Sequence, residues 1–165
     1  MRSSSLKRYW HMLLMKLAAT LPISRQRRAV IFQKAGVSIT PNGGVRVGKV
    51  TFDSIHPEDV HIDKRSSIAD GCILVTHYMD VKNTKETFAY YRGSIHIGRG
   101  VYLGSNCIVT KPITIGHGAI ISAGSIINKD IPPFEVWGGV PAKFLCKRYE
   151  SEEQLQQHLK EVEKY

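Results

Sequence analysis

Hydrophobic residues recur every six positions through the second half of the chain. The large aliphatic members of this series are Ile97, Leu103, Val109, Ile115, Ile121 and Ile127. A second series of mostly small or aliphatic residues lies two positions earlier: Ile95, Val101, Cys107, Ile113, Ala119 and Ser125, followed by Ile131. An α-helix repeats every 3.6 residues and a strand every two, so neither alone explains this period. The period of six predicts a β-helix built from hexapeptide repeats.

The period also predicts the geometry of this β-helix. Each hexapeptide supplies one short strand and one corner, and three hexapeptides close one coil of a triangular prism. The large aliphatic side chain points inward and stacks on its counterpart in the next coil, about 4.8 Å away. Small residues such as Gly98, Gly104, Gly116 and Ser122 follow the aliphatic positions, where a corner leaves little room for a side chain.

The repeat is interrupted once. Its register extends back through Ile62, Ile68 and Leu74, but the next position holds Asp80, and the pattern resumes only at Ile97. Residues 78–94 are therefore predicted to form a loop inserted at a corner, a place where solenoid loops tend to line the binding face. Before Ile62, from residue 37 onward, the pattern is extended but irregular.

Helices are predicted at both ends of the chain. In residues 6–35 a stripe of Leu and Trp side chains predicts a first helix that ends at Pro22, and Ser24 can cap a second helix over Arg25–Lys34, which Gly36 ends. Ser151 and Gln154 form a capping-box pattern for a helix within residues 148–165. We therefore divide the chain into a helical segment (1–36), the β-helix (37–147) and a C-terminal helix (148–165).

Charge is distributed unevenly along the chain. The formal net charge is +9, yet residues 1–52 hold ten Lys or Arg and no Asp or Glu, whereas the remainder holds 13 basic and 14 acidic residues. This asymmetry indicates an anionic partner for the N-terminal third: a membrane surface, an anionic saccharide or the phosphates of a cofactor. The repeat region is not basic and has no recognised nucleic-acid motif, which disfavours a nucleic-acid partner. The N-terminal helices either seal the end of the prism or rest on anionic lipid as a peripheral contact.

The cysteines and the apolar N-terminal segment indicate where in the cell we expect the protein. Cys72 and Cys107 occupy small inward positions of the repeat, and with Cys146 they form no CxxC motif, so we expect reduced thiols in a reducing cytoplasm. The segment Leu13–Leu21 is too short to span a bilayer, and Lys16 interrupts it. No clean cleavage site follows this segment, which disfavours a signal peptide.

His77 is the candidate catalytic residue because it lies where the repeat breaks, directly after Thr76. A lone histidine in a loop often has no role, but imidazole is the side chain best suited to move a proton near neutral pH. Such a base works best when an acceptor holds its other nitrogen. Asp53 is the first candidate for that acceptor and Asp70 the second, while a backbone carbonyl would also serve.

The run IGRGVYLGSNCIVTKPITIGHGAIISAGSIINKDIPPFEVWGGVPAKFL, residues 97–145, carries a family resemblance. It resembles the C-terminal half of the left-handed β-helix acyltransferases, nearest the maltose and galactoside O-acetyltransferases and those of capsular polysaccharide and lipopolysaccharide synthesis. The resemblance covers roughly Gly36 to Lys147 and implies an all-β solenoid with left-handed coils. General rules for parallel crossovers favour right-handed connections, so the handedness rests on the resemblance alone.

The resemblance also implies an activity. It matches Thr76-His77 to the family's catalytic histidine, so His77 would be the general base that helps a sugar or glycan hydroxyl attack the thioester of acetyl-CoA. Asp53 falls where related polysaccharide acetyltransferases carry a similar acid. Family members bind acetyl-CoA between neighbouring prisms, which implies a homotrimer, and a backbone N–H near Gly104 or Ser105 would meet the oxyanion.

On the same analogy, three groups of residues would contact the cofactor. Small residues would admit the pantetheine arm, cations would meet the phosphates and an apolar pair would pack on adenine: respectively Gly104, Ser122 and Ala123; Lys129, Lys143 and Arg148; Val140 and Pro141. The acceptor pocket would be lined from the inserted loop by Tyr90, Tyr91 and Arg92, because aromatic and guanidinium groups suit sugar and phosphate recognition.

Three alternative functions were compared with the sugar O-acetyltransferase. Two of them are disfavoured, and one stays open. A γ-class carbonic anhydrase has the same prism but needs a His-x4-His pair, and His61, His96 and His117 have no partner at that spacing, so no metal site is expected. A non-catalytic scaffold would have no reason to carry His77 together with the GGVPAK segment. A streptogramin-type xenobiotic acetyltransferase is the nearest alternative enzyme.

Overall fold

The computed structural model of the chain describes residues 2–79 and 90–162. Residues 80–89 of the predicted inserted loop, including Asp80, lie outside the described residues.

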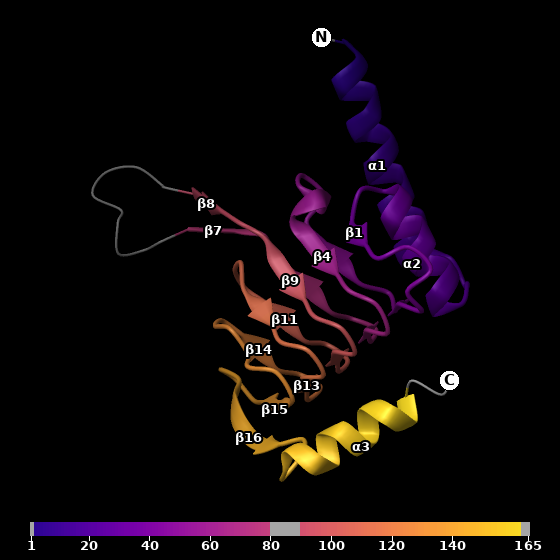
Figure 1. Ribbon diagram of the computed structural model, residues 1–165. Helices are drawn as coiled ribbons and strands as arrows, with labels where there is room; N and C mark the ends of the chain where they lie inside the picture. The colour runs from indigo at the N-terminus through magenta and orange to yellow at the C-terminus, as the bar shows by residue number, and fades with distance from the viewer. Residues whose placement is uncertain (1, 80–89, 163–165) are drawn as a thin grey trace.

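Short strands form three sheets that the chain visits in turn, coil after coil (Figure 1). The strands of these sheets are parallel except β16, which pairs antiparallel with β15. The first sheet has the order β1 (Ser38–Ile39), β4 (Val60–Ile62), β9 (Ile95–Ile97) and β12 (Thr114–Ile115). The second has the order β16 (Lys143–Lys147), β15 (Glu135–Gly138), β13 (Ile120–Ile121), β10 (Tyr102–Leu103), β5 (Ser67–Ile68) and β2 (Arg46–Val47). The third has the order β14 (Ile126–Ile127), β11 (Ile108–Val109), β6 (Ile73–Leu74) and β3 (Thr51–Phe52). This arrangement is the prism that the six-residue period predicts.

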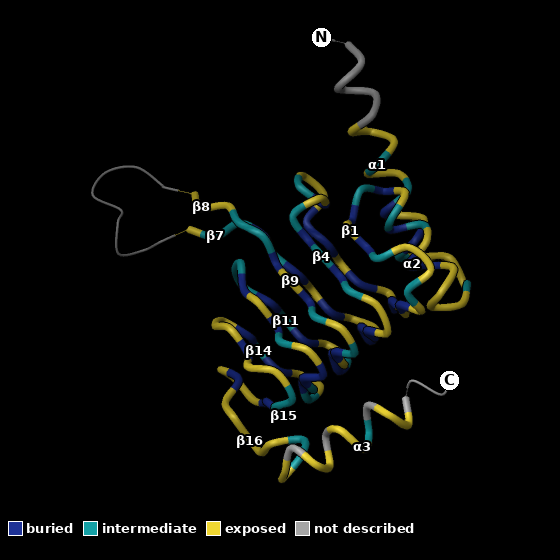
Figure 2. Tube along the Cα trace, in the orientation of Figure 1, coloured by how far each residue is buried: buried dark blue, intermediate teal, exposed yellow. Residues whose placement is uncertain are grey.

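The interior of the prism consists of columns of apolar side chains, all aliphatic except Trp137. Residues paired across neighbouring coils in these columns are, sheet by sheet, Ile62, Ile97 and Ile115; Ile68, Leu103, Ile121 and Trp137; and Leu74, Val109 and Ile127. All of them are buried, as the dark inner face in Figure 2 shows. Burial of these columns stabilises the fold by about 25 cal/mol for each Å² of apolar surface removed from water.

The helix α2 (Arg25–Lys34) closes the N-terminal end of the prism. It begins where the sequence predicts, with the Ser24 hydroxyl accepting a hydrogen bond from the Arg27 N–H at 3.3 Å. Its buried Phe32 packs edge-to-face on Phe52 of the first coil, with 4.8 Å between ring centroids. The longer helix α1 (Arg2–Thr20) packs on α2. Of the two helices, α2 is thus the one whose aromatic side chain, Phe32, covers the end of the core.

The helix α3 (Glu152–Val162) stands at the other end of the prism (Figure 1). Half of the predicted capping box is present, because the Gln154 N–H donates to the Ser151 hydroxyl at 3.4 Å. The Gln154 side chain does not return to the Ser151 N–H; its Oε1 accepts from the Glu150 N–H at 3.1 Å. Among the helices of residues 2–79 and 90–162, none is long and apolar enough to cross a membrane.

The interruption of the repeat projects from one corner of the prism. The strands β7 (His77–Met79) and β8 (Tyr90–Arg92) pair antiparallel and leave the body of the molecule as two arms (Figure 1). His77 lies directly opposite Arg92 in this pairing. A short 3₁₀-helix, η1 (Pro57–Asp59), lies between β3 and β4. The insertion therefore begins at the candidate catalytic histidine.

Candidate active site

His77 and Asp53 meet because they follow neighbouring parallel strands. In the third sheet Phe52 of β3 pairs with Leu74 of β6, and both strands run in the same direction. Asp53 follows β3 directly, and Thr76 and His77 follow β6 by two and three residues. The two segments therefore leave the sheet at the same edge, which brings the carboxylate beside the imidazole.

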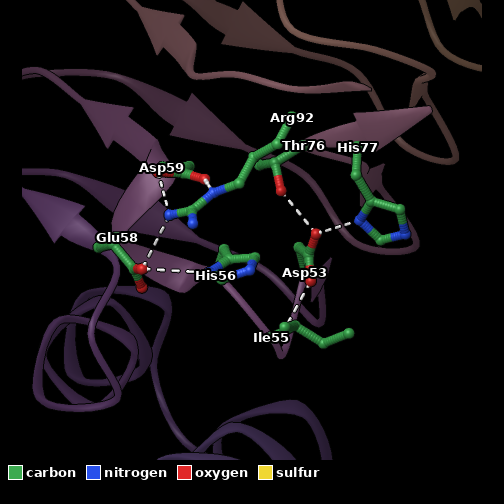
Figure 3. A network of polar contacts seen from close by, with 8 residues as sticks. All are labelled: Asp53, Ile55, His56, Glu58, Asp59, Thr76, His77 and Arg92. Atoms are coloured by element: carbon green, nitrogen blue, oxygen red, sulfur yellow. Dashed lines mark hydrogen bonds and ion pairs between the residues drawn. The ribbon is translucent and has the colours of Figure 1, made fainter. Parts of the chain in front are cut away.

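Asp53 lies at the centre of a hydrogen-bond network at this edge (Figure 3). His77 Nδ1 lies 2.6 Å from Asp53 Oδ2, and the Thr76 hydroxyl donates to the same oxygen at 2.5 Å. The Ile55 N–H donates to Asp53 Oδ1 at 2.9 Å. The Asp53 side chain is only 2% exposed, whereas that of His77 is 41% exposed. The carboxylate thus holds Nδ1 of a ring whose Nε2 is the nitrogen left for a substrate.

Asp53 is held in its ionised form. Burial by itself raises the pKa of this carboxyl, but hydrogen bonds from Thr76, from the Ile55 N–H and from His77 outweigh burial and lower the pKa below its ordinary value of 3.8. An ionised carboxylate is the acceptor that fixes the proton of a neutral imidazole on Nδ1 and stabilises the imidazolium. The arrangement suits an imidazole that accepts a proton at Nε2 and later returns it.

The second candidate acid does not reach this site. Asp70 lies on the turn between β5 and β6, which is the opposite edge of the third sheet from His77. Its carboxylate accepts from the Lys49 N–H at 2.7 Å and pairs with Arg25 at 3.1 Å. The structure therefore brings Asp53, and not Asp70, to the imidazole.

Arg92, expected in the acceptor pocket, is engaged by carboxylates instead (Figure 3). Its Nε lies 2.5 Å from Asp59 Oδ2, and its Nη2 lies 3.0 Å from Asp59 Oδ1 and 3.1 Å from Glu58 Oε1. This bidentate contact ties β8 to η1, directly opposite His77 in the hairpin. Sequence reasoning missed both Thr76 as a partner of Asp53 and the acidic pair that binds Arg92. The only signal for the latter is the consecutive Glu58-Asp59.

The two tyrosines of the insertion differ in surroundings. Tyr91 stacks on Tyr78, with 5.6 Å between ring centroids, and is 39% exposed, whereas Tyr90 is 71% exposed. Of the three residues expected to line the acceptor pocket, Tyr90 is thus the one that the structure leaves most accessible.

The residues expected to contact the pantetheine arm lie at a different corner from His77. Gly104, Ser122 and Ala123 follow β10 and β13, on the side where the chain enters the third sheet, whereas His77 lies where the chain leaves it. A side chain on Gly104 would come within 2.6 Å of the Ala123 backbone nitrogen, so packing between coils alone requires a glycine here. Within one chain the two groups stand at opposite edges of the same sheet.

Two of the three cations expected to meet phosphates, Lys129 and Arg148, have partners within the chain. Lys129 Nζ lies 4.7 Å from the centroid of the Trp137 ring. Arg148 Nη1 donates to the Gly118 carbonyl at 3.0 Å, and the guanidinium lies 5.5 Å from the Tyr149 ring. Lys143 is exposed on β16, and so are Val140 and Pro141 in the turn before it.

Two histidines that lack a partner at the His-x4-His spacing lie side by side in the structure. His61 of β4 and His96 of β9 are in register, and their rings stack in parallel with centroids 4.6 Å apart. Burial, and the neighbouring His96 ring, lower the pKa of His61. They line a groove of about 850 Å³ along the first sheet, together with His117 and Asp130. Among the described residues, no group of three or more His, Cys, Asp or Glu side chains is arranged to hold a metal ion.

Comparison with known proteins supports the interpretation of the repeat. Residues 94–129 match the family described as bacterial transferase hexapeptide, with six repeats. A chloramphenicol acetyltransferase of Klebsiella aerogenes is 44% identical to this hexapeptide-repeat chain over 61 residues, which are 37% of the chain and 29% of the relative. The matches span about a third of the length of the first such relatives.

Solved structures share the fold over most of the chain. A maltose O-acetyltransferase from Clostridium difficile 630 superposes with a TM-score of 0.67 at 23% identity, covering 88% of each chain. A galactoside acetyltransferase in complex with coenzyme A superposes with a TM-score of 0.59 at 23% identity, covering 90% of this chain and 84% of that one. The hexapeptide-repeat chain thus has the fold of these acetyltransferases.

Proposed function

We propose that this protein is an acetyl-CoA-dependent O-acetyltransferase that acts on a sugar or on a polysaccharide or lipopolysaccharide intermediate, with left-handed coils as in the family it resembles. The observation that carries the proposal is the hydrogen-bonded series Thr76, Asp53 and His77 at the mouth of the inserted loop. A buried carboxylate that orients a half-exposed imidazole is the arrangement of a general base.

The proposed reaction is a direct transfer. His77 Nε2 takes the proton of an acceptor hydroxyl while the hydroxyl oxygen attacks the thioester carbonyl of acetyl-CoA. The C–S bond then breaks, and the imidazolium returns its proton to the leaving sulfur. Throughout this sequence Asp53 stays ionised and stabilises the positive charge on the ring. A backbone N–H near Gly104 or Ser105 would stabilise the oxyanion.

Acetyl-CoA would be the co-substrate, as the complexes of related structures with acetyl-CoA and with coenzyme A suggest. Gly104, Ser122 and Ala123 would lie along the pantetheine arm, Lys129, Lys143 and Arg148 near the phosphates, and Val140 and Pro141 against adenine. Tyr90 and Tyr91 would contact the acceptor. Arg92 would reach the acceptor only if it released Asp59, so its role here is to hold the hairpin.

The outer face of the third sheet supports a homotrimer. Ile73, Ile108 and Ile126 form an apolar row there, in register across three strands, and Ile73 is exposed. The corresponding outward positions of the first sheet are polar, such as His61, His96 and Thr114. Packing of the isoleucine rows around a threefold axis would place the His77 edge of one chain beside the Gly104 edge of the next. The residues around His77 and those around Gly104, which lie apart within one chain, would then lie side by side between two chains.

A second candidate function is the acetylation of a xenobiotic such as chloramphenicol. The similarity to chloramphenicol acetyltransferases favours it, although it covers only part of each chain. We propose a cytoplasmic location for either activity, since Cys72, Cys107 and Cys146 are free thiols and Cys146 is exposed.

The test is release of free coenzyme A from acetyl-CoA in the presence of sugars, nucleotide sugars, glycans and chloramphenicol. We expect turnover with a saccharide, together with a product whose mass increases by one acetyl group. Turnover with chloramphenicol alone would favour the second candidate. Failure of the protein to bind acetyl-CoA in calorimetry would overturn both candidates and favour a structural role.

A further inference from the structure

One face of α1 is apolar and has no partner among the described residues. Trp10, Leu13 and Leu17 of α1, and Leu21 directly after its last residue, recur at spacings of three and four and are exposed, Trp10 to 60%. Tyr9 beside them is 73% exposed. The opposite face of the helix, with Met15 and Ala18, is buried. Apolar side chains therefore lie on the solvent-facing side of α1 as well as on its buried side.

The position of α1 is fixed by a buried arginine on α2. Arg28 is 4% exposed, and its guanidinium donates to the carbonyls of Ala18 at 2.7 Å and Leu21 at 2.9 Å. A cation at these terminal carbonyls satisfies groups that the end of a helix leaves without partners. Because Phe32 of α2 covers the end of the prism, the outer stripe of α1 is not needed to close the core. The stripe is held away from the body of the protein.

The charged side chains of α1 and α2 are all basic, although Asp70 of the prism pairs with Arg25. Arg8, Lys16, Arg27 and Lys34 are exposed on the two helices, and the sequence holds no acidic residue before Asp53. Protein partners that bind an apolar helix face have no need for an exclusively basic border. An anionic bilayer surface matches both features, because it takes Trp and Leu side chains into the acyl boundary and attracts Lys and Arg to the headgroups.

We propose that the outer face of α1 docks on a membrane surface rich in anionic lipid. The exposed Trp10, Leu13, Leu17 and Leu21 enter the boundary between headgroups and acyl chains, and the basic side chains beside them meet the phosphates. This interaction holds the prism at the bilayer without a membrane-spanning helix. It requires neither acetyl-CoA nor an acceptor, so its test is independent of the proposed enzymatic activity.

The test is co-sedimentation of the full chain with vesicles of phosphatidylcholine, with and without phosphatidylglycerol, at low and at high salt. We expect binding that requires phosphatidylglycerol and weakens with salt. The double variant Trp10→Ser/Leu13→Ser should lose about tenfold or more in vesicle affinity, since the apolar and electrostatic contributions act together. The double variant Arg8→Gln/Lys16→Gln should lose roughly fivefold for each cation removed. The control Tyr102→Ser, which removes an exposed aromatic ring from the flank of the prism at β10, should bind as wild type does.

Three results would overturn the inference. The first is wild-type protein that remains in the supernatant with every vesicle, and the second is equal binding to neutral and anionic vesicles. The third is a Trp10→Ser/Leu13→Ser variant that keeps its vesicle binding and changes its oligomeric state in light scattering. In that last case a second copy of the chain covers the stripe. Circular dichroism of each variant should match the wild type, because the substituted side chains are exposed.

Discussion

Replacement of Asp53 by asparagine tests the role of the buried carboxylate with the least change in shape. Both carboxylate oxygens accept hydrogen bonds, Oδ2 from Thr76 and His77 and Oδ1 from the Ile55 N–H. An amide has only one oxygen, so in either orientation its NH₂ group faces a site that holds a donor. The variant must therefore lose the contact with Ile55 or disturb the pair formed with His77.

The expected loss follows from the kind of contact. A charge-assisted hydrogen bond contributes about 1.5–3 kcal/mol, which corresponds to roughly 10- to 150-fold in rate. The upper part of this range applies, because the Nδ1–Oδ2 distance is 2.6 Å and the carboxylate is 2% exposed. We expect Asp53→Asn to lower kcat by about 10²-fold while the KM for acetyl-CoA changes little, since no cofactor contact is removed.

Release of coenzyme A under saturating acetyl-CoA measures this loss, and two comparisons make it specific. Asp70→Asn is the matched control, because that carboxylate also accepts a backbone N–H but lies at the opposite edge of the sheet; a change within roughly twofold is expected. In a His77→Ala background, Asp53→Asn should cause no further loss. Full kcat in Asp53→Asn, or an equal loss in both backgrounds, would refute the reasoning.

Three further predictions concern stability and the hairpin. Because the pKa of Asp53 in the folded protein lies below its ordinary 3.8, the ionised group stabilises the fold above that pH, and this stabilisation is lost as pH falls through the folded-state pKa. The difference in Tm between wild type and Asp53→Asn should therefore shrink below about pH 4, and a constant difference would contradict it. Arg28→Met should lower the free energy of unfolding in urea by about 2–4 kcal/mol, because it leaves buried carbonyls without a donor, whereas the exposed Arg25→Met should change it by less than about 0.5 kcal/mol. Arg92→Gln and Asp59→Asn should each lower kcat by about tenfold through displacement of His77; an effect of Arg92→Gln alone would show that Arg92 contacts the acceptor instead.

The sequence predicts the regular part of the fold well because the repeat encodes both register and direction. Ile97, Ile115 and their counterparts lie 18 residues apart, one coil, so their stacking follows from counting alone. The caps of α2 and α3 were also predictable, since Ser24 and Ser151 act locally.

The six-residue period could not predict contacts between coils that contain different numbers of residues. His61 and His96 are in register although they lie 35 residues apart, because the inserted loop separates their strands. The bidentate contact of Arg92 with Asp59 likewise joins the insertion to the irregular first coils, where no period sets the register. The position of His77 beside Asp53 was predictable because the break in the repeat marks His77. The bond from Thr76 to Asp53 was not predictable, since the backbone path after β6 decides which hydroxyl reaches Asp53.

The most direct test of the central claim separates binding from chemistry at His77. Acetyl-CoA affinity would be measured by calorimetry, and turnover by release of coenzyme A, for wild type and His77→Ala with the best acceptor. We expect the variant to bind acetyl-CoA about as tightly as wild type and to lose 10²-fold or more in kcat, roughly what removal of a general base costs. A variant that keeps its turnover would show that a group other than His77 accepts the proton.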